Sequence, residues 1–279
     1  MTAPPVPNSL EIVRSNHPRG PFRCAVFDFD GTLSLVRADW QGLMVPMMVE
    51  ALAATGTSET HEALTHLVAD FVTRLTGQPT MRQMEALAAE LIRRGSPQPD
   101  PQLYLDRFLE KLLSRTAERI AAVQSGQMDR EDLLIAGSRP LLAALQAQGI
   151  LLAIASGTEL AHVEREARLL GIDHFFTAGI FGPETNSAAF SKEAVMRQLL
   201  AKQSLRGDQL IAIGDGPAEI LAAKPLGALA LGIASDEVHG DGRLNPLKRE
   251  HLIRAGADII IPDYQQLPPI LELLALNDR

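Results

Sequence analysis

The stretch CAVFDFDGTL, residues 24–33, is the most informative part of the chain. Its first four residues are apolar, as in a strand buried on both faces, and Asp28 and Asp30 follow at once. If the chain turns at Gly31, both carboxylates face the crevice at the carboxyl end of the strand. Because close like charges repel, this pair favours a neutralising cation, and Mg²⁺ prefers oxygen ligands. The alternative is an ordinary acidic turn that closes a strand.

Short apolar runs bounded by Gly, Asp or Ser predict the remaining strands. Helical patterns alternate with them, and several end at a glycine suited to a left-handed cap. Strand followed by helix, repeated, predicts an α/β fold with a doubly wound parallel sheet. The predicted strands are Arg23–Phe27, Ile150–Ala155, Phe175–Phe181, Gln209–Ile213, Ala228–Ile233 and Asp258–Ile261. The predicted helices are Pro140–Gln148, Glu159–Leu170, Lys192–Lys202, Ala218–Leu226, Leu247–Ala255 and Gln266–Leu276, and the capping glycines are Gly149, Gly171, Gly227 and Gly256.

The pattern changes between Ser34 and Ile135, where apolar residues recur at three- and four-residue spacing without a convincing strand. We therefore expect an α/β core formed by residues 1–34 and 136–279, with an all-helical cap, residues 35–135, inserted after the first strand. Such an insertion leaves the sheet where open α/β folds bind ligands, so it can act as a lid. Its expected helices are Leu43–Thr55, Glu62–Leu75, Thr80–Arg94 and Pro101–Val123.

The composition excludes several classes of protein. The 279 residues include 26 Lys and Arg against 34 Asp and Glu, a formal net charge of −8, and no basic tract, so nucleic acid is not an expected partner. The chain has no apolar run long enough for a membrane span or a signal peptide, so no membrane partner is expected. Cys24 is the only cysteine, which suits a reducing cytoplasm. The oligomeric state is not indicated by the sequence.

A second acidic cluster, Gly214–Glu219 (GDGPAE), follows the predicted strand Gln209–Ile213. Asp215 lies at the end of that strand, and Pro217 suits the first turn of the next helix. Glu219 lies one turn further and could reach the same cation directly or through water. The alternative is that both acids complement the helix dipole without binding a metal.

Two further elements lie between these clusters. Ser156-Gly157-Thr158 follows a predicted strand and precedes a helix, where a hydroxyl and backbone N–H groups can bind an anion. Thr158 could equally cap the helix. Lys192 begins a predicted helix, where its charge opposes the dipole, which favours a functional role over a merely solvated lysine.

These four elements, in this order, resemble the four motifs of the haloacid dehalogenase superfamily. The helical insertion resembles the first cap class of that superfamily, which phosphoglycolate phosphatase and β-phosphoglucomutase relatives share. The resemblance implies that Asp28 is the nucleophile that forms an aspartyl-phosphate. It implies that Asp30 protonates the leaving alcohol and then activates water, and this second aspartate argues against dehalogenation.

The resemblance also implies a ligand set. Mg²⁺ would be held by the Asp28 carboxylate, the Asp30 backbone carbonyl and Asp215. The fourth motif more often ends in Asp than in Glu, so Asp215 is the safer metal ligand and Glu219 the less certain one. The residues implied to hold the phosphoryl oxygens are Ser156, Gly157 and Lys192.

The substrate-reading residues are expected in the cap. In this cap class a glycine-containing loop dips into the active site, and the turn between two cap helices, residues 75–80, is similar by position. An ordinary interhelix turn is the alternative. Arg37 and Trp40 lie near the expected hinge, where Arg37 could meet a substrate anion and Trp40 could pack the lid. The candidate substrate contacts are Arg37, Gln78, Thr80 and Arg82.

The sequence therefore predicts a cytoplasmic, Mg²⁺-dependent phosphatase with a helical cap. Its expected partner is a small phosphorylated metabolite, such as a sugar phosphate or a short phospho-acid. A phosphomutase is the first alternative, since it uses the same aspartyl-phosphate but returns the phosphoryl group to another hydroxyl. A binding or regulatory protein with little activity is the second.

Overall fold

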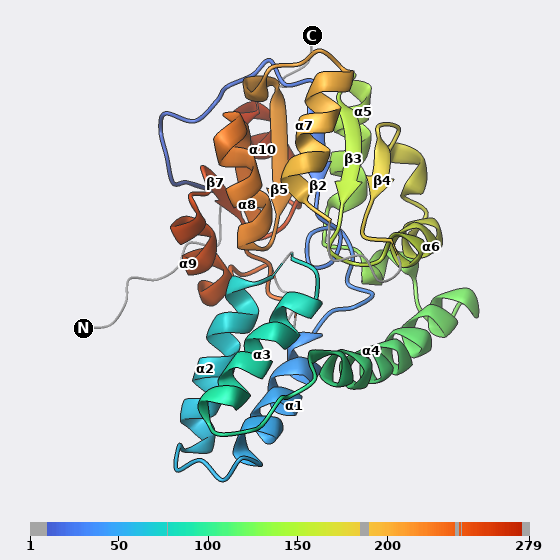
Figure 1. Cartoon of the computed structure of the whole chain (residues 1–279). Helices are drawn as coiled ribbons and strands as arrows, with labels where there is room; N and C mark the ends of the chain where they lie inside the picture. The colour runs from blue at the N-terminus through green and yellow to red at the C-terminus, as the bar shows by residue number, and fades with distance from the viewer. Residues whose placement is uncertain (1–9, 77, 185–189, 238–239, 241, 275–279) are drawn as a thin grey trace.

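Figure 1 shows the computed structural model of the chain, in which a sheet flanked by helices lies above a group of inserted helices. The structure describes residues 10–76, 78–184, 190–237, 240 and 242–274. The first nine residues, the last two residues of the predicted helix Gln266–Leu276, and parts of the loops at 75–80 and 236–246 lie outside these ranges.

The described residues form a seven-stranded sheet in the order β1-β7-β6-β5-β2-β3-β4. All neighbouring strands are parallel except β1, which runs antiparallel to β7. The strands are β1 (Glu11–Ile12), β2 (Cys24–Phe27), β3 (Leu151–Ala155), β4 (Gly179–Phe181), β5 (Leu210–Gly214), β6 (Leu229–Ile233) and β7 (Ile259–Ile261). The six predicted strands are thus present, and the short edge strand β1 is an addition. The first half of the predicted strand Phe175–Phe181 is wrong, because the turn η2 (Asp173–Phe175) precedes β4.

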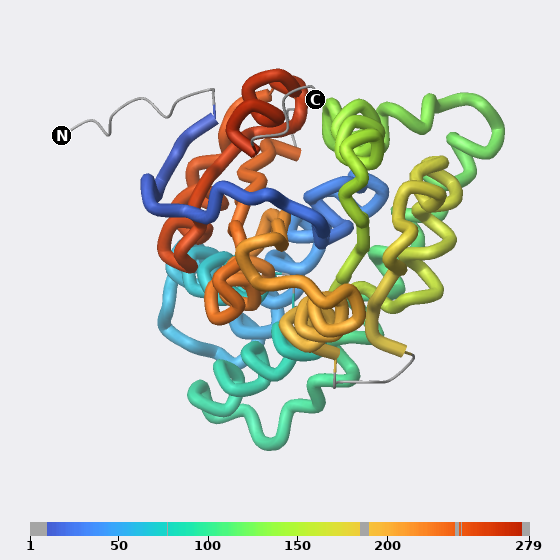
Figure 2. Tube along the Cα trace, turned by 90° about the horizontal axis from the view of Figure 1, so that it is seen from above, coloured from blue at the N-terminus to red at the C-terminus, as the bar shows by residue number. Residues whose placement is uncertain are grey.

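Helices cover both faces of the sheet because alternate strand residues point to opposite sides. Phe27 and Ile213 belong to one apolar cluster, whereas Val26 and Ala212 belong to the other. Figure 2 shows the two helix layers on opposite sides of the strands. The first face is covered by α5 (Ser138–Ala147), α6 (Leu160–Leu170) and α10 (Leu267–Leu273), and the second by α7 (Lys192–Lys202), α8 (Pro217–Ala223) and α9 (Pro246–Ala255).

The helix ends follow local rules. The four glycines predicted as left-handed caps all have positive φ angles, between 64° and 100°. Helix α8 stops earlier than predicted, at Ala223, and continues as the 3₁₀ turn η4 (Lys224–Leu226), because Pro225 has no N–H for the α-helical ladder. The remaining 3₁₀ turns are η1 (Arg130–Leu133) and η3 (Gly207–Gln209).

Four helices form the insertion: α1 (Gln41–Ala53), α2 (His61–Arg74), α3 (Met81–Arg93) and α4 (Pro101–Gln124). They share an apolar cluster separate from the two around the sheet, and Met44, Met48 and Met84 are fully buried in it. Figure 1 shows α1, α2 and α3 side by side below the sheet, with α4 crossing beside them. Within the described ranges, no helix is long and apolar enough to cross a lipid bilayer.

The two connections between insertion and sheet domain run side by side. The N–H of Leu35 donates to the carbonyl of Leu133 at 2.8 Å, and that of Ile135 donates to Leu33 at 2.9 Å. Arg119 of α4 donates to three carbonyls of the outgoing connection, those of residues 35, 36 and 38. The cap is therefore joined to the core, close to Asp30, by two segments that are hydrogen-bonded to each other.

Candidate active site

Asp28 lies at the mouth of the sheet, directly after β2. Its N–H donates to the carbonyl of Ile213 on β5 at 2.8 Å, and its side chain is buried. The Nζ of Lys192, the first residue of α7, lies 2.8 Å from Oδ1 of Asp28. The same ammonium group contacts Glu219 of α8. The structure thus brings together three residues that the sequence placed in separate motifs.

Burial of this cluster shifts the pKa values of its charged side chains. Burial raises the pKa of Asp28 to about 6, with Lys192 opposing the shift and Asp215 adding to it. Burial also raises the pKa of Glu219 to about 8 against the effect of Lys192. Burial acts to lower the pKa of Lys192, but its two carboxylate neighbours outweigh it and the pKa is raised. The lysine therefore keeps its charge.

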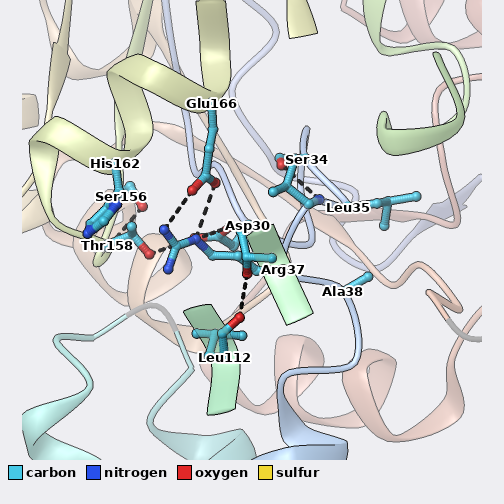
Figure 3. A network of polar contacts seen from close by, with 12 residues as sticks. Asp30, Ser34, Leu35, Arg37, Ala38, Leu112, Ser156, Thr158, His162 and Glu166 are labelled. Atoms are coloured by element: carbon cyan, nitrogen blue, oxygen red, sulfur yellow. Dashed lines mark hydrogen bonds and ion pairs between the residues drawn. The ribbon is translucent and has the colours of Figure 1, made fainter. Parts of the chain in front are cut away.

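Asp30 is held by Thr158 and Arg37. Its Oδ2 accepts a 2.7 Å hydrogen bond from the hydroxyl of Thr158, and the Nε of Arg37 lies 3.7 Å from its Oδ1. Burial raises its pKa to about 6, although Arg37 opposes that shift. Figure 3 shows Asp30 between Thr158 and Arg37. Thr158 thus contacts a carboxylate of the site.

Arg37 is fixed by a residue that the sequence analysis missed. Its Nη2 and Nε donate to the two carboxylate oxygens of Glu166 at 2.7 and 3.2 Å, and both side chains are buried (Figure 3). A signal existed, because Glu166 interrupts the apolar stripe of the predicted helix Glu159–Leu170, where Val163 and Ala167 are buried. This bidentate pair sets the direction from which Arg37 approaches Asp30.

Asp215 lies against the turn that carries the two motif aspartates. Gly31 has φ +70°, and a Cβ atom there would overlap the Asp215 carboxylate. Glycine is therefore required both for the turn and for the close approach. Oδ2 of Asp215 accepts a 2.8 Å hydrogen bond from Lys248, while its buried Oδ1 has no hydrogen-bond partner among the described residues.

Lys248 is a second residue that the sequence analysis missed. Its Nζ lies 2.8 Å from Asp215, 2.5 Å from Glu237 and 3.4 Å from the hydroxyl of Ser235. That hydroxyl donates to the carbonyl of Gly31 at 3.2 Å. The signal that singled out Lys192 applied here too, since Lys248 lies in the first turn of α9, where a cation opposes the dipole.

The donor set fits a hard divalent cation. Oδ1 of Asp215 and Oε2 of Glu219 are both buried and lack a hydrogen-bond partner in the described part of the chain. Within that part, no three Asp, Glu, His or Cys side chains gather into a metal site by themselves. The predicted ligand set does not require a third carboxylate side chain, because it combines the carboxylates of Asp28 and Asp215 with the backbone carbonyl of Asp30. Oxygen ligands of this kind suit Mg²⁺, which keeps several waters.

Ser156 and Gly157 follow β3 on the other side of β2. The N–H of Ser156 donates to the carbonyl of Phe181 at 2.9 Å, and its hydroxyl accepts from the N–H of Thr158 at 3.0 Å. The Ser156 hydroxyl hydrogen and the Gly157 N–H are the donors this turn offers to an anion. Both residues line the cavity described next.

A cavity of about 400 Å³ separates the core from the cap. From the predicted site it is lined by Asp28, Asp30, Arg37, Gln78, Thr80, Ser156 and Gly157, together with Trp40. Arg82 is not among its lining residues and pairs instead with Glu85 on the exposed face of α3, at 2.9 Å.

The cap loop approaches the core at Gly216. A Cβ atom on Gly216, the residue after Asp215, would lie 2.7 Å from the carbonyl oxygen of Thr76. Thr76 is buried and lines the cavity beside Gln78. The described part of the loop at residues 75–80 therefore packs directly on the fourth motif.

The mostly parallel sheet gathers two carboxylates and a lysine at the carboxyl ends of its strands, under a helical cap, which is where open α/β folds bind ligands. Residues 22–227 match the family model described as haloacid dehalogenase-like hydrolase. The chain belongs to this family, as the resemblance of its four motifs predicted.

Solved structures agree with this placement. A predicted phosphoglycolate phosphatase from Haemophilus somnus 129pt is 19% identical, with a TM-score of 0.58 over 90% of this chain and 98% of that one. A β-phosphoglucomutase from Clostridium difficile is 15% identical, with a TM-score of 0.57 over 91% and 97%. A HAD family hydrolase from Deinococcus radiodurans R1, with bound phosphate and sodium, is 21% identical, with a TM-score of 0.55 over 92% and 97%. At these identities they show the fold. No curated protein matches the sequence.

Proposed function

We propose that this protein is a Mg²⁺-dependent phosphatase that hydrolyses a small phosphorylated metabolite through an aspartyl-phosphate on Asp28. The observation that carries the proposal is the 2.8 Å contact between Lys192 Nζ and Asp28 Oδ1 at the buried mouth of the sheet. A carboxylate attacks a phosphate dianion poorly unless positive charge offsets their repulsion. The lysine supplies part of that charge, and Glu219 holds it in place.

Mg²⁺ would be held by the carboxylates of Asp28 and Asp215 and by the backbone carbonyl of Asp30. When bound, it would offset negative charge on the nucleophile and on the phosphoryl oxygens. Glu219 has a buried free oxygen but already contacts Lys192, so we assign it to positioning the lysine. Ser156, Gly157 and Lys192 would hold the phosphoryl oxygens.

Asp30 would move the protons. Its carboxyl group would donate a proton to the leaving oxygen and then accept one from the attacking water. A pKa raised to about 6 keeps both protonation states accessible near neutral pH. The Thr158 hydroxyl and Arg37 contact this carboxyl group and hold it in place. Asp28 and Asp30 therefore have different roles although they are two residues apart.

Asp30→Asn tests the division of roles. The amide can neither protonate the leaving oxygen nor accept a proton from water, so we expect both the formation and the decay of the phospho-enzyme to slow, each by about 10²- to 10⁴-fold. Rapid-quench measurement of acid-stable protein-bound phosphate would follow both half-reactions. Phospho-enzyme that decays at the wild-type rate would show that another group activates the water.

The overall proposal is tested by phosphate release from a panel of phosphate monoesters, with Mg²⁺ and with EDTA. We expect turnover that needs Mg²⁺. Isomerised sugar phosphate without net phosphate release would instead identify a phosphomutase, the activity named for the Clostridium difficile neighbour. Absence of Mg²⁺-dependent turnover on every ester, aryl phosphates included, would favour a binding or regulatory role.

A further inference from the structure

The cavity wall opposite the phosphate end is largely hydrocarbon. The turn after β3 and the two motif aspartates form the core side, whereas α1, α4 and the described residues between Thr76 and Gln83 form the cap side. The cap residues that give this wall accessible apolar surface are Trp40, Leu105, Leu109 and Leu113, and behind them Met44, Phe108 and Leu112 belong to the buried cap cluster. A cavity of about 400 Å³ has room for a phosphoryl group and a leaving group of moderate size.

The wall offers little to a second anionic group. Of the described residues that line the cavity, Arg37 and His162 are the two basic ones. The carboxylate of Glu166 accepts from Nε and Nη2 of Arg37 and, with Asp30 beside it, offsets the charge of the guanidinium. Burial, together with Arg37, lowers the pKa of His162, which keeps the ring neutral near pH 7. Acidic residues also line the cavity, Asp106 and Glu184 among them, and they would repel a carboxylate on the substrate.

The wall offers equally little to a polyhydroxylated group. The Thr76 hydroxyl and the Gln83 amide both donate to the carbonyl of Val72, at 3.3 Å. The Gln102 amide donates to Asp106 at 2.7 Å. Among the described cap residues, Gln78 and Thr80 are the neutral polar groups of the lining that remain available. A sugar that entered this space would therefore lose water from several hydroxyl groups and find few neutral partners in exchange, which is costly.

We propose that the substrate is the monophosphate ester of an uncharged alcohol whose bulk is hydrocarbon, alkyl or aryl, rather than a phospho-acid or a sugar phosphate. This inference rests on the proposed phosphatase function and narrows its substrate class. The phosphoryl group would lie at Asp28 and Ser156, with the hydrocarbon between α1 and α4.

A matched substrate series tests it. We would compare kcat/KM for butyl phosphate, hexyl phosphate, 6-phosphooxyhexanoate and glucose 6-phosphate, all with Mg²⁺. Each added methylene should raise kcat/KM by about fourfold, because burying one methylene is worth about 0.8 kcal/mol. The terminal carboxylate should lower kcat/KM by about 100-fold relative to hexyl phosphate, and glucose 6-phosphate should fall at least about tenfold below it.

Substitutions in the wall link this preference to the structure. Leu105→Gln and Leu109→Gln each place an amide in the cavity wall and should flatten the dependence on chain length to less than about twofold per methylene. Leu103→Gln is the matched control, since Leu103 lies on the same helix α4, is exposed and does not line the cavity. It should keep the full dependence. Circular dichroism and thermal unfolding would establish that each variant is folded.

The possible outcomes distinguish a failure of the proposed substrate class from a failure of the proposed phosphatase function. Mg²⁺-dependent turnover in which the phospho-acid or the sugar phosphate equals or exceeds hexyl phosphate would overturn the substrate class and leave the phosphatase function standing. An undiminished chain-length dependence in folded Leu105→Gln and Leu109→Gln would also overturn it. No Mg²⁺-dependent phosphate release from any of the four esters, or from phenyl phosphate, would overturn the phosphatase function itself.

Discussion

The core and cap sides of the cavity are built from different kinds of side chain. On the core side, Asp28 lines the cavity and contacts Lys192 at 2.8 Å, and the nearby Asp215 contacts Lys248 at the same distance. On the cap side, α1 and α4 present mainly hydrocarbon. Charge that is held in ion pairs can stabilise a reaction at a defined atom, whereas an apolar wall selects by size and polarity. In the proposed function, the core would act on the phosphoryl group and the cap would select the alcohol to which it is attached.

The largest expected effect lies at the core nucleophile. Asp28→Asn keeps the shape of the side chain but removes its nucleophilic oxygen, so turnover should fall by at least about 10⁴-fold on every ester. Steady-state phosphate release and phospho-enzyme trapping would measure it. Thermal unfolding serves as the control, because Lys192 keeps Glu219 as a partner and the fold should persist. Wild-type turnover in this variant would show that another group attacks.

The core was the more predictable of the two sides. Asp28 and Asp215 follow buried strands, and the carboxyl ends of parallel strands meet at one edge, so the sequence predicted that these two residues lie close together. Lys192 begins the helix α7, and its place beside them was implied by the family resemblance. The pairing of Arg37 with Glu166 could not be predicted in this way, because it joins residues 129 positions apart through tertiary packing. Strand β1 has two residues, too few for a periodic pattern.

The cap was predictable as helices but not as a binding surface. Apolar periodicity gave the approximate extents of α1 to α4, and these residues pack into a separate cluster. The same periodicity cannot say which apolar residues fill the cluster and which face the cavity. Met44 does both, since it is fully buried in the cluster and lines the cavity.

The next largest effect is expected at Lys248, beside the proposed metal ligand Asp215. Lys248→Met leaves the carboxylates of Asp215 and Glu237 close together without their shared cation. Loss of one partner from a buried ion pair costs roughly 3–5 kcal/mol, so the metal-free variant should unfold about 10 °C below wild type. Mg²⁺ should restore most of this loss, because it neutralises Asp215 in place of the ammonium. Thermal unfolding with EDTA and with Mg²⁺ would measure both.

Lys224→Met is the matched control for this change. Lys224 lies 2.7 Å from Asp258, a buried carboxylate that none of the four motifs contains. This variant should also lose stability, but Mg²⁺ should not restore it. Equal responses of the two variants to Mg²⁺ would show that Lys248 is an ordinary structural lysine.

A smaller effect is expected where core and cap touch. Gly216→Ala adds a methyl group 2.7 Å from the Thr76 carbonyl, so the cap loop must move away from the fourth motif. Because small displacements of positioning groups slow catalysis, kcat/KM should fall by about tenfold with little change in stability. The comparison variant is Gly232→Ala, which places a methyl group 3.0 Å from Leu252 in the core. It should lower stability and leave kcat/KM within about twofold. A loss of kcat/KM in Gly232→Ala but not in Gly216→Ala would show that the cap loop does not contribute to the active site.

The smallest expected effects concern Gln78 and Arg82, two cap residues that the sequence analysis predicted as substrate contacts. Gln78 lines the cavity, whereas Arg82 is half exposed and pairs with Glu85 three residues further along α3. Gln78→Ala should change KM by about 3- to 10-fold, the worth of one neutral hydrogen bond. Arg82→Ala should leave kcat and KM unchanged within about twofold, because an exposed ion pair contributes little. Kinetics on hexyl phosphate and phenyl phosphate would measure both. A tenfold rise in KM for Arg82→Ala would mean that Arg82 leaves Glu85 when substrate binds, and the cap would then contribute charge as well as hydrocarbon to the cavity.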